Sequence, residues 1–236
     1  MAQPTLATPS TTASTTASLA DTATARSLMV DGQVRPNKVT DPRIIATMRS
    51  LPRERFVPAG LEVLAYTDED VPLGGGRFLM EPMVIARLVQ TIAPRPGERA
   101  LVVGAGSLYG AALLAACGAT VTALEEDPAL IALGKGVLDI LPPGVTPVEG
   151  KLAAGWKPGA PYDLVLIEGA VAEIPPAIAE QLKPQGGRLT TVLRGEGRVA
   201  QAVLAEPIGH GLSVQPVFDC AVPLLPGMGK PSAFVF

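Results

Sequence analysis

The sequence predicts an α/β fold in which helices cover both faces of a mainly parallel β-sheet. Between residues 96 and 195, short runs of β-branched and other apolar residues alternate with segments of helical spacing. Glycine- and proline-rich turns separate these runs, for example at residues 94–97 and 186–187. Strands that alternate with helices in this way form parallel sheets with helices on their faces. Hydrophobic residues make up 47% of the 236 residues, which is enough for a large core.

Ahead of that region, the sequence predicts a disordered tail followed by helices. Residues 1–25 consist almost entirely of Ala, Thr, Ser and Pro, and they lack the basic and apolar parts of a secretory signal. The residues that follow have helical spacing, and Asp41 before Pro42 is typical of a helix start. A glycine turn at residues 74–76 precedes a further helix, which we expect from residue 82 to residue 92.

The central region supplies the predicted sheet. We expect strands at 100–103, 120–125, 145–148, 163–167 and 188–193, with helices at 107–117, 128–138 and 175–182. The chain beyond residue 196 alternates weakly and contains several prolines, which favours β-hairpin-like structure. We therefore expect one domain over residues 26–236, composed of an N-terminal helical part (26–95), a cofactor-binding core (96–195) and a C-terminal β-segment (196–236).

Composition and charge exclude several functions. A formal net charge of −3 does not suit a surface that neutralises phosphates. One histidine and two isolated cysteines provide no metal-ligand cluster, so we expect no metal site. Residues 100–124 carry no formal charge over a length that could cross a bilayer, but their glycines favour two buried strands around a helix. We expect a cytoplasmic protein that binds neither nucleic acid nor membrane.

The strongest chemical signal is a glycine turn after the first predicted strand of the core. Gly104-Ala105-Gly106-Ser107 follows an apolar run and opens a helix, so the backbone can approach a ligand closely. Glu125 stands nineteen residues past Gly106, where a carboxylate can accept hydrogen bonds from ribose hydroxyls. The alternative is an ordinary strand-to-helix turn. A dinucleotide is disfavoured because Tyr109 occupies the third glycine position, so an adenosyl ligand without a pyrophosphate fits better.

An ordered set of motifs resembles the protein-L-isoaspartate O-methyltransferases. The resemblance covers roughly residues 28–195, with a fainter similarity at Val222-Pro223-Leu224. The similar stretches are residues 29–58, Ala65-Tyr66-Thr67-Asp68, residues 72–82, residues 96–106, Ala160-Pro161-Tyr162-Asp163, Glu173-Ile174-Pro175, and Gln181-Leu182 with Gly186-Gly187-Arg188-Leu189. Their combination and order are far more specific than any single motif.

The resemblance implies an S-adenosylmethionine-dependent methyltransferase with a Rossmann-like sheet. The implied activity is protein repair, in which the free α-carboxylate of an isoaspartyl residue in a damaged protein or peptide is methylated. The implied cofactor residues are Gly104, Ala105, Gly106 and Ser107 beside the methionine and ribose, Glu125 on the ribose hydroxyls, and Glu149, Gly150 and Lys151 in a loop facing the adenine. The acceptor carboxylate is ionised at neutral pH, so the reaction requires neither a histidine nor a metal.

This sequence departs from the family pattern at positions that would face ligands. Met80 stands where the family has an active-site serine, and it cannot donate a hydrogen bond. Arg77 stands in the same loop; we expect it to be a surface arginine, while a bidentate partner of the substrate carboxylate or a partner of Glu81 are the alternatives. Val102 and Leu108 replace an acidic and a small residue near the glycine turn, and Lys151 replaces an acid facing the adenine.

Three other functions compete with the repair activity. The first is a non-catalytic protein that keeps the fold as a binding module, and the second is a methyltransferase with a changed acceptor. A nicotinamide-dependent oxidoreductase is a more distant third.

Overall fold

The computed structural model describes residues 12–195, 197 and 199–229, and its centre is a seven-stranded sheet in the order β5-β4-β3-β6-β7-β8-β9. The first five of these strands are parallel, whereas β8 and β9 are antiparallel to their neighbours. The strands are β3 (Arg99–Val103), β4 (Thr120–Glu125), β5 (Val145–Glu149), β6 (Leu164–Val171), β7 (Arg188–Leu193), β8 (Gln201–Ile208) and β9 (Gly211–Asp219). The predicted α/β class is confirmed.

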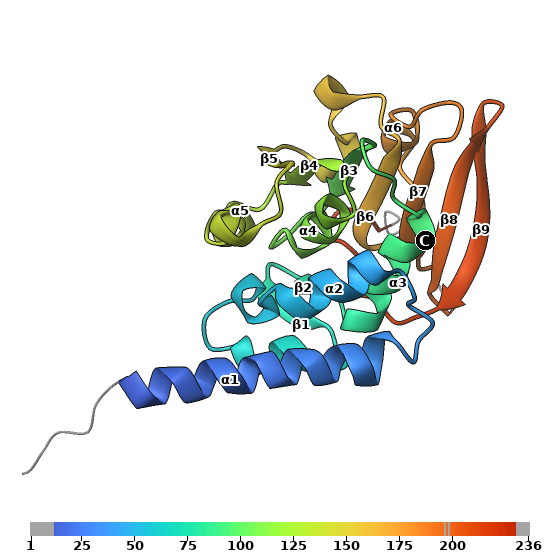
Figure 1. The fold of residues 1–236 in the computed structure, drawn as a ribbon. Helices are drawn as coiled ribbons and strands as arrows, with labels where there is room; N and C mark the ends of the chain where they lie inside the picture. Colours follow the sequence, from blue (N-terminus) through green and yellow to red (C-terminus); the bar gives the residue numbers. More distant parts are fainter. Residues whose placement is uncertain (1–11, 196, 198, 230–236) are drawn as a thin grey trace, which may run out of the picture.

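Helices cover the two faces of the sheet unequally (Figure 1). Alternate residues of the buried strands face opposite ways, so Val102 belongs to one apolar cluster and Val103 to the other. The larger cluster lies under α3 (Pro82–Ile92) and α4 (Tyr109–Ala116), with α5 (Pro128–Lys135) beside β4 and β5. The smaller cluster includes residues of α6 (Pro176–Ala179) and of the chain after β9. In this C-terminal segment (residues 222–228), Leu225 and Met228 therefore belong to the second layer, whereas Val222 belongs to the larger cluster.

The N-terminal part is helical, as predicted, but its helices begin earlier in the chain. Helix α1 runs from Thr12 to Met29, continues as a π-helical turn at Val30–Val34, and is followed by α2 (Pro42–Ser50). Short 3-10 turns at Arg53–Phe56 and Glu62–Tyr66 lead to a separate two-stranded sheet, β1 (Val71–Gly74) and β2 (Arg77–Leu79). The remaining 3-10 turns are Leu138–Ile140, Leu152–Ala154 and Lys157–Gly159.

The expected disordered tail over residues 1–25 differs from the structure, in which residues 12–25 belong to α1. Five alanines, the residue type with the highest helix propensity, lie in this helix and offset its many threonines. Arg26 fixes the C-terminal end, because its guanidinium donates to Tyr66 Oη at 3.1 Å and pairs with Glu54 at 3.2 Å. Residues 1–11 lie outside the described residues.

Most predicted elements are confirmed, and the largest differences are in length. Helix α3 and strands β4 and β7 have the predicted bounds, whereas β6 is longer and α6 shorter than predicted. The hairpin of β8 and β9 turns at Gly209 and His210 and confirms the expected β-structure at the C-terminal edge. Within the described ranges, no helix has the length and apolar character needed to cross a membrane.

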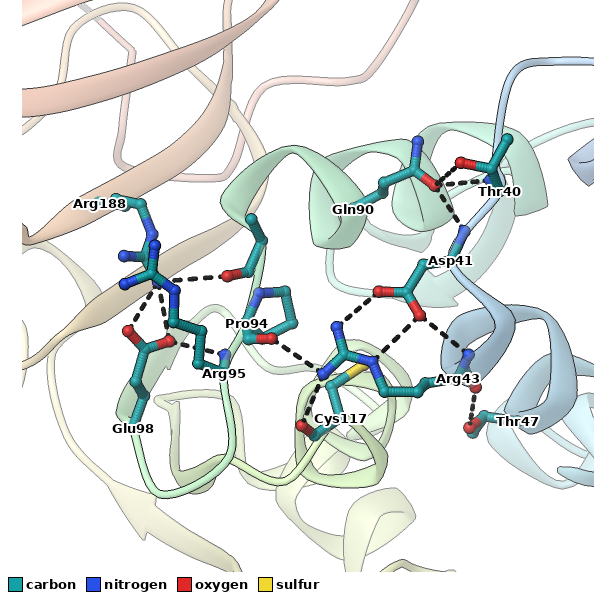
Figure 2. Close-up of polar contacts among 11 residues, drawn as sticks. Thr40, Asp41, Arg43, Thr47, Gln90, Pro94, Arg95, Glu98, Cys117 and Arg188 are labelled. Carbon is teal, nitrogen blue, oxygen red and sulfur yellow. Dashed lines mark hydrogen bonds and ion pairs between the residues drawn. The ribbon is translucent and has the colours of Figure 1, made fainter.

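Asp41 connects the start of α2 to the ends of two other helices (Figure 2). Its carboxylate accepts from the backbone N–H of Arg43 at 2.9 Å and pairs with the Arg43 guanidinium at 2.6 Å. That guanidinium also donates to the carbonyls of Pro94 and Cys117, and Gln90 of α3 accepts from the Asp41 N–H at 3.0 Å. The predicted helix start is thus confirmed, and it holds the helical part against the core.

We predict that Asp41→Ala lowers the free energy of unfolding by about 1–2 kcal/mol, because the first turn of α2 loses its N-cap. Asp41→Asn keeps a side-chain oxygen that can accept from the Arg43 N–H, so its free energy of unfolding should fall clearly less than that of Asp41→Ala. The Arg43 guanidinium holds the pKa of Asp41 below its usual range, so this stabilisation should be present above the carboxyl's unfolded pKa and decline as the pH falls below it. Urea denaturation of both variants at pH 7 and pH 3 measures these effects, and equal losses in the two variants would contradict the capping role.

We also predict that Ala93→Gly stabilises the protein by up to about 1 kcal/mol. Ala93 ends α3 with φ +50°, a left-handed conformation that costs a residue with a Cβ about 1–2 kcal/mol. Its side chain is exposed, so little packing is lost. The carbonyl of Ala93 still accepts from Arg188 in the variant. Thermal denaturation checks the prediction, with Ala86→Gly in the middle of the same helix as a control that should destabilise.

Candidate functional site

The carboxyl ends of β3, β4 and β6 meet at one edge of the sheet and define the candidate site. The glycine turn follows β3, Glu125 ends β4, and Glu168 follows Ile167, which pairs with the last residue of β3. Because β4 and β6 flank β3 on opposite sides, the strand order reverses at β3. In open α/β sheets, ligands bind outside the carboxyl ends of the strands at such a reversal.

The glycine turn has the backbone geometry that the sequence predicts. Gly104 and Gly106 have φ values of +73° and +52°, which are left-handed and favour glycine. The N–H groups of Gly104 and Ala105 both donate to the carbonyl of Leu124, which fixes the turn to β4. Leu108 is also left-handed, with φ +74°, so its position demands the small residue that this chain lacks. The backbone is thus left-handed at all three positions, although only two of them are glycine.

Glu125 is buried, and its carboxylate is satisfied by groups of the protein itself. One oxygen accepts from Arg77 Nη1 at 2.9 Å and from the N–H groups of Glu126 and Asp127 at 2.8 and 3.1 Å. The other oxygen accepts from the N–H of Gly106 at 2.8 Å. A carboxylate accepts about four hydrogen bonds in total. In this conformation Oε1 is fully occupied, whereas Oε2 accepts from Gly106 alone and keeps one acceptor position for a ribose hydroxyl.

Arg77 is the largest departure from what the sequence suggested. The expectation of a surface arginine is wrong, because only 5% of Arg77 is exposed and its guanidinium lies between Glu125 and the glycine turn. Its Nη2 donates to the carbonyl of Gly104 at 2.7 Å. Among the described ion pairs, Arg77 has Glu125 as its partner and not Glu81. Burial, together with Asp70 and Asp68, raises the pKa of Glu81 to about 7.

A small cavity of about 10 Å³ adjoins Arg77, and Met80 and Glu168 contribute to its lining. Met80 is fully buried, and its carbonyl accepts from Arg53 Nη2 at 2.5 Å. Glu168 is 5% exposed, and its Oε2 has no hydrogen-bond partner among the described residues. Burial raises the pKa of Glu168 to about 8, although the nearby Arg77 and Arg53 act in the opposite direction. A largely protonated acid therefore lies close to the position of the missing serine.

The predicted adenine side of the site forms a second group. Glu149, Gly150 and Lys151 line an open depression of about 350 Å³ at the end of β5. A neighbouring cavity of about 230 Å³ lies between α5 and strands β4 and β5, and Gly106, Glu125 and Glu149 line it together. The structure thus brings these predicted residues into one region.

The neighbours of three further residues near this region are also defined. Lys151 Nζ lies 3.8 Å from the carboxylate of Glu126. The Trp156 ring lies against Gly150, where a Cβ would come within 3.3 Å of it. Ser107 is buried, and its Oγ has no partner among the described residues.

The space directly over the glycine turn is filled by side chains of the same chain. A Cβ on Gly104 would lie 2.9 Å from Arg77 Nη2 and 3.5 Å from both Cδ atoms of Leu225. Leu225 also lies over Gly169, at the end of β6, and its N–H donates to the carbonyl of Ala170 at 2.8 Å. These side chains leave little space directly over Gly104, whereas the cavity of about 230 Å³ beside Gly106 and Glu125 lies next to the covered part of the turn.

Sequence reasoning missed Glu168 and Leu225. Glu168 had a signal, because it is the one charged residue in the apolar run 164–171, all of which is buried. Charged residues are rarely buried in a strand without a functional or structural partner. Leu225 had no such signal, since an apolar residue in a proline-rich C-terminal segment suggests nothing about a site more than a hundred residues away.

We predict that Glu168→Gln increases the free energy of unfolding at pH 8 more than at pH 5. A carboxyl whose pKa is about 8 when folded and about 4.3 when unfolded destabilises the folded state as the pH rises between these values. The wild-type free energy of unfolding should fall by up to about 1.4 kcal/mol per pH unit in that interval from this group alone. Denaturation of both proteins at pH 5 and pH 8 measures the difference. A difference that is the same at both pH values would show that Glu168 is already ionised.

Comparisons with known proteins bear on the family and the fold. A model of the family described as Protein-L-isoaspartate(D-aspartate) O-methyltransferase matches residues 25–206. A protein-L-isoaspartate O-methyltransferase of Methylorubrum extorquens (strain PA1) is 40% identical over 166 residues, which is 70% of this chain and 73% of the relative. One of Koribacter versatilis (strain Ellin345) is 32% identical over 206 residues, or 86% and 92% of the two chains.

A solved protein-L-isoaspartate O-methyltransferase superposes with a TM-score of 0.73 at 22% identity, covering 88% of this chain and 67% of that one, and supports the fold. The match of the family model extends from the end of α1 to β8 and so includes the helical part, the glycine turn and most of the sheet. The chain belongs to the protein-L-isoaspartate(D-aspartate) O-methyltransferase family.

Proposed function

We propose that this enzyme methylates the free α-carboxylate of isoaspartyl residues in damaged proteins and peptides, with S-adenosyl-L-methionine as the methyl donor. The observation that carries the proposal is the family match over residues 25–206, together with relatives of up to 40% identity that are named for this activity. The similarity includes the helical part, which a shared nucleotide-binding core alone would not explain.

The proposed cofactor residues are those that the sequence singled out. Gly104, Ala105, Gly106 and Ser107 would line the methionine and ribose side, and Glu125 would accept from the ribose hydroxyls. Glu149, Gly150 and Lys151 would face the adenine. The placement of these residues around the ends of β3, β4 and β5 supports the assignment.

The acceptor side of the site carries unusual chemistry for this reaction. Arg77 and Glu168 are the ionisable side chains that line the small cavity beside Met80. An isoaspartyl carboxylate is itself the nucleophile and needs no general base, so the loss of a serine hydroxyl at Met80 removes a hydrogen bond and not a proton acceptor. Met80 has no hydrogen-bond donor, so we assign it no part in orienting the acceptor.

We predict that the protein transfers labelled methyl from S-adenosyl-L-methionine to a peptide with one isoaspartyl residue, and not to the same peptide with aspartate. The two peptides differ only in which carboxylate is free, so they form a matched pair. Scintillation counting of the separated peptides gives the result. If the folded protein labels neither peptide, the isoaspartyl assignment is wrong for this chain, and labelling of both would indicate a less selective carboxyl methyltransferase.

A further inference from the structure

We propose that Arg77 is a gate of the cofactor site, with two alternative carboxylate partners. Bound to Glu125 it covers the glycine turn, and moved to Glu168 it exposes the turn to the cofactor. The inference rests on the proposed function, because it concerns how the same site admits its methyl donor.

In the closed position Arg77 covers one oxygen of Glu125 and the glycine turn. The Glu125 carboxylate accepts four hydrogen bonds, and three of them come from backbone N–H groups that are fixed by the turn and by the start of α5. Arg77 supplies the fourth and is the one donor that belongs to a movable side chain. Departure of Arg77 therefore uncovers Oε1, while Oε2, which accepts from Gly106 alone, already has an acceptor position for a ribose hydroxyl. The same movement frees the Gly104 carbonyl and the space over the turn.

The alternative position of Arg77 is beside Glu168, whose carboxyl group can still accept a hydrogen bond. This side chain is buried, lines the same small cavity as Arg77, and has an oxygen without a partner among the described residues. A buried arginine that loses one carboxylate is costly unless another carboxylate replaces it. Glu168 offers that replacement without exposure of the guanidinium to solvent. Arg77 would then lie on the β6 side of the site, clear of Glu125.

The connection between β1 and β2 permits such a movement. Gly74, Gly75 and Gly76 precede Arg77 with φ values of +100°, +58° and +75°, so three successive residues have no Cβ to restrict rotation. The two strands form a sheet of their own and make no ladder with the seven-stranded sheet. Movement of this loop breaks no hydrogen bond of the central sheet.

The gate has a pH dependence of defined sign. The charged and titratable groups that act on Glu168 are Arg77, Arg53, Glu125 and Tyr109. In the closed form Glu168 is largely protonated below its pKa of about 8, whereas an ion pair with Arg77 requires its carboxylate. Opening therefore releases a proton, and cofactor affinity should rise with pH up to about 8, by at most roughly tenfold per unit.

The direct test is the affinity for S-adenosyl-L-methionine measured by isothermal titration calorimetry, without any acceptor. Arg77→Gln should bind roughly tenfold more tightly than the wild-type protein at pH 7, because removal of the closed form raises the competent fraction. Arg55→Gln is the matched control, since Arg55 pairs with Asp139 on the surface, and its affinity should equal that of the wild type. Circular dichroism of each variant establishes that it is folded.

Two further variants test the gate without substituting Arg77. Leu225→Ala removes the other side chain that lies over Gly104 and should also tighten binding. Glu168→Gln cannot form the second ion pair and should abolish the rise of affinity between pH 6 and pH 8. Equal or weaker binding by Arg77→Gln overturns the gate, as does a failure of both wild type and Arg77→Gln to bind.

These results separate the gate from the proposed function. Tighter binding by Arg77→Gln without methyl transfer from the wild-type protein to isoaspartyl peptide supports the gate and contradicts the proposed activity. Isoaspartyl methylation by a wild-type protein whose affinity equals that of Arg77→Gln supports the activity and contradicts the gate.

Discussion

The buried ion pair between Arg77 and Glu125 is the interaction on which the site depends. Its two side chains are each about 5% exposed or less, and they connect the two-stranded sheet to the ends of β3 and β4. Two charges that have left water stabilise each other only while both are present, so neither residue can be removed without consequence for the other. Glu125 depends less on the pair than Arg77 does, because three backbone N–H groups donate hydrogen bonds to its carboxylate even without Arg77.

Much of the fold was predictable because it depends on local patterns. Apolar runs bounded by glycine and proline predicted β4 and β7 at their observed limits, and Asp41 before Pro42 predicted the start of α2. The glycine turn was equally accessible, since its left-handed φ values require glycine at Gly104 and Gly106. In each case the physical cause lies within a few residues of the effect. The helical half of residues 1–25 was missed because composition alone did not distinguish alanine-rich helix from disorder.

The interior of the site was not predictable for the opposite reason. Arg77 is buried because it pairs with Glu125, a carboxylate forty-eight residues further along the chain. No local sequence pattern predicts such a long-range contact. Glu168 shows the same limit: its position in the strand was visible, but its missing hydrogen-bond partner is a property of the packed site. Met80 was identified as a departure from the family, yet its neighbours Arg77 and Glu168 became apparent only in three dimensions.

The position of Leu225 near the end of the chain also means that the covering segment is synthesised after the central sheet. This residue follows the β8–β9 hairpin, so every strand of the central sheet leaves the ribosome before the segment that covers the glycine turn. A nascent chain can therefore complete its nucleotide-binding edge and still expose Gly104 and Gly169 to solvent. The crevice can close only after this segment has been synthesised, and the segment is held to β6 by hydrogen bonds such as that from Leu225 to Ala170.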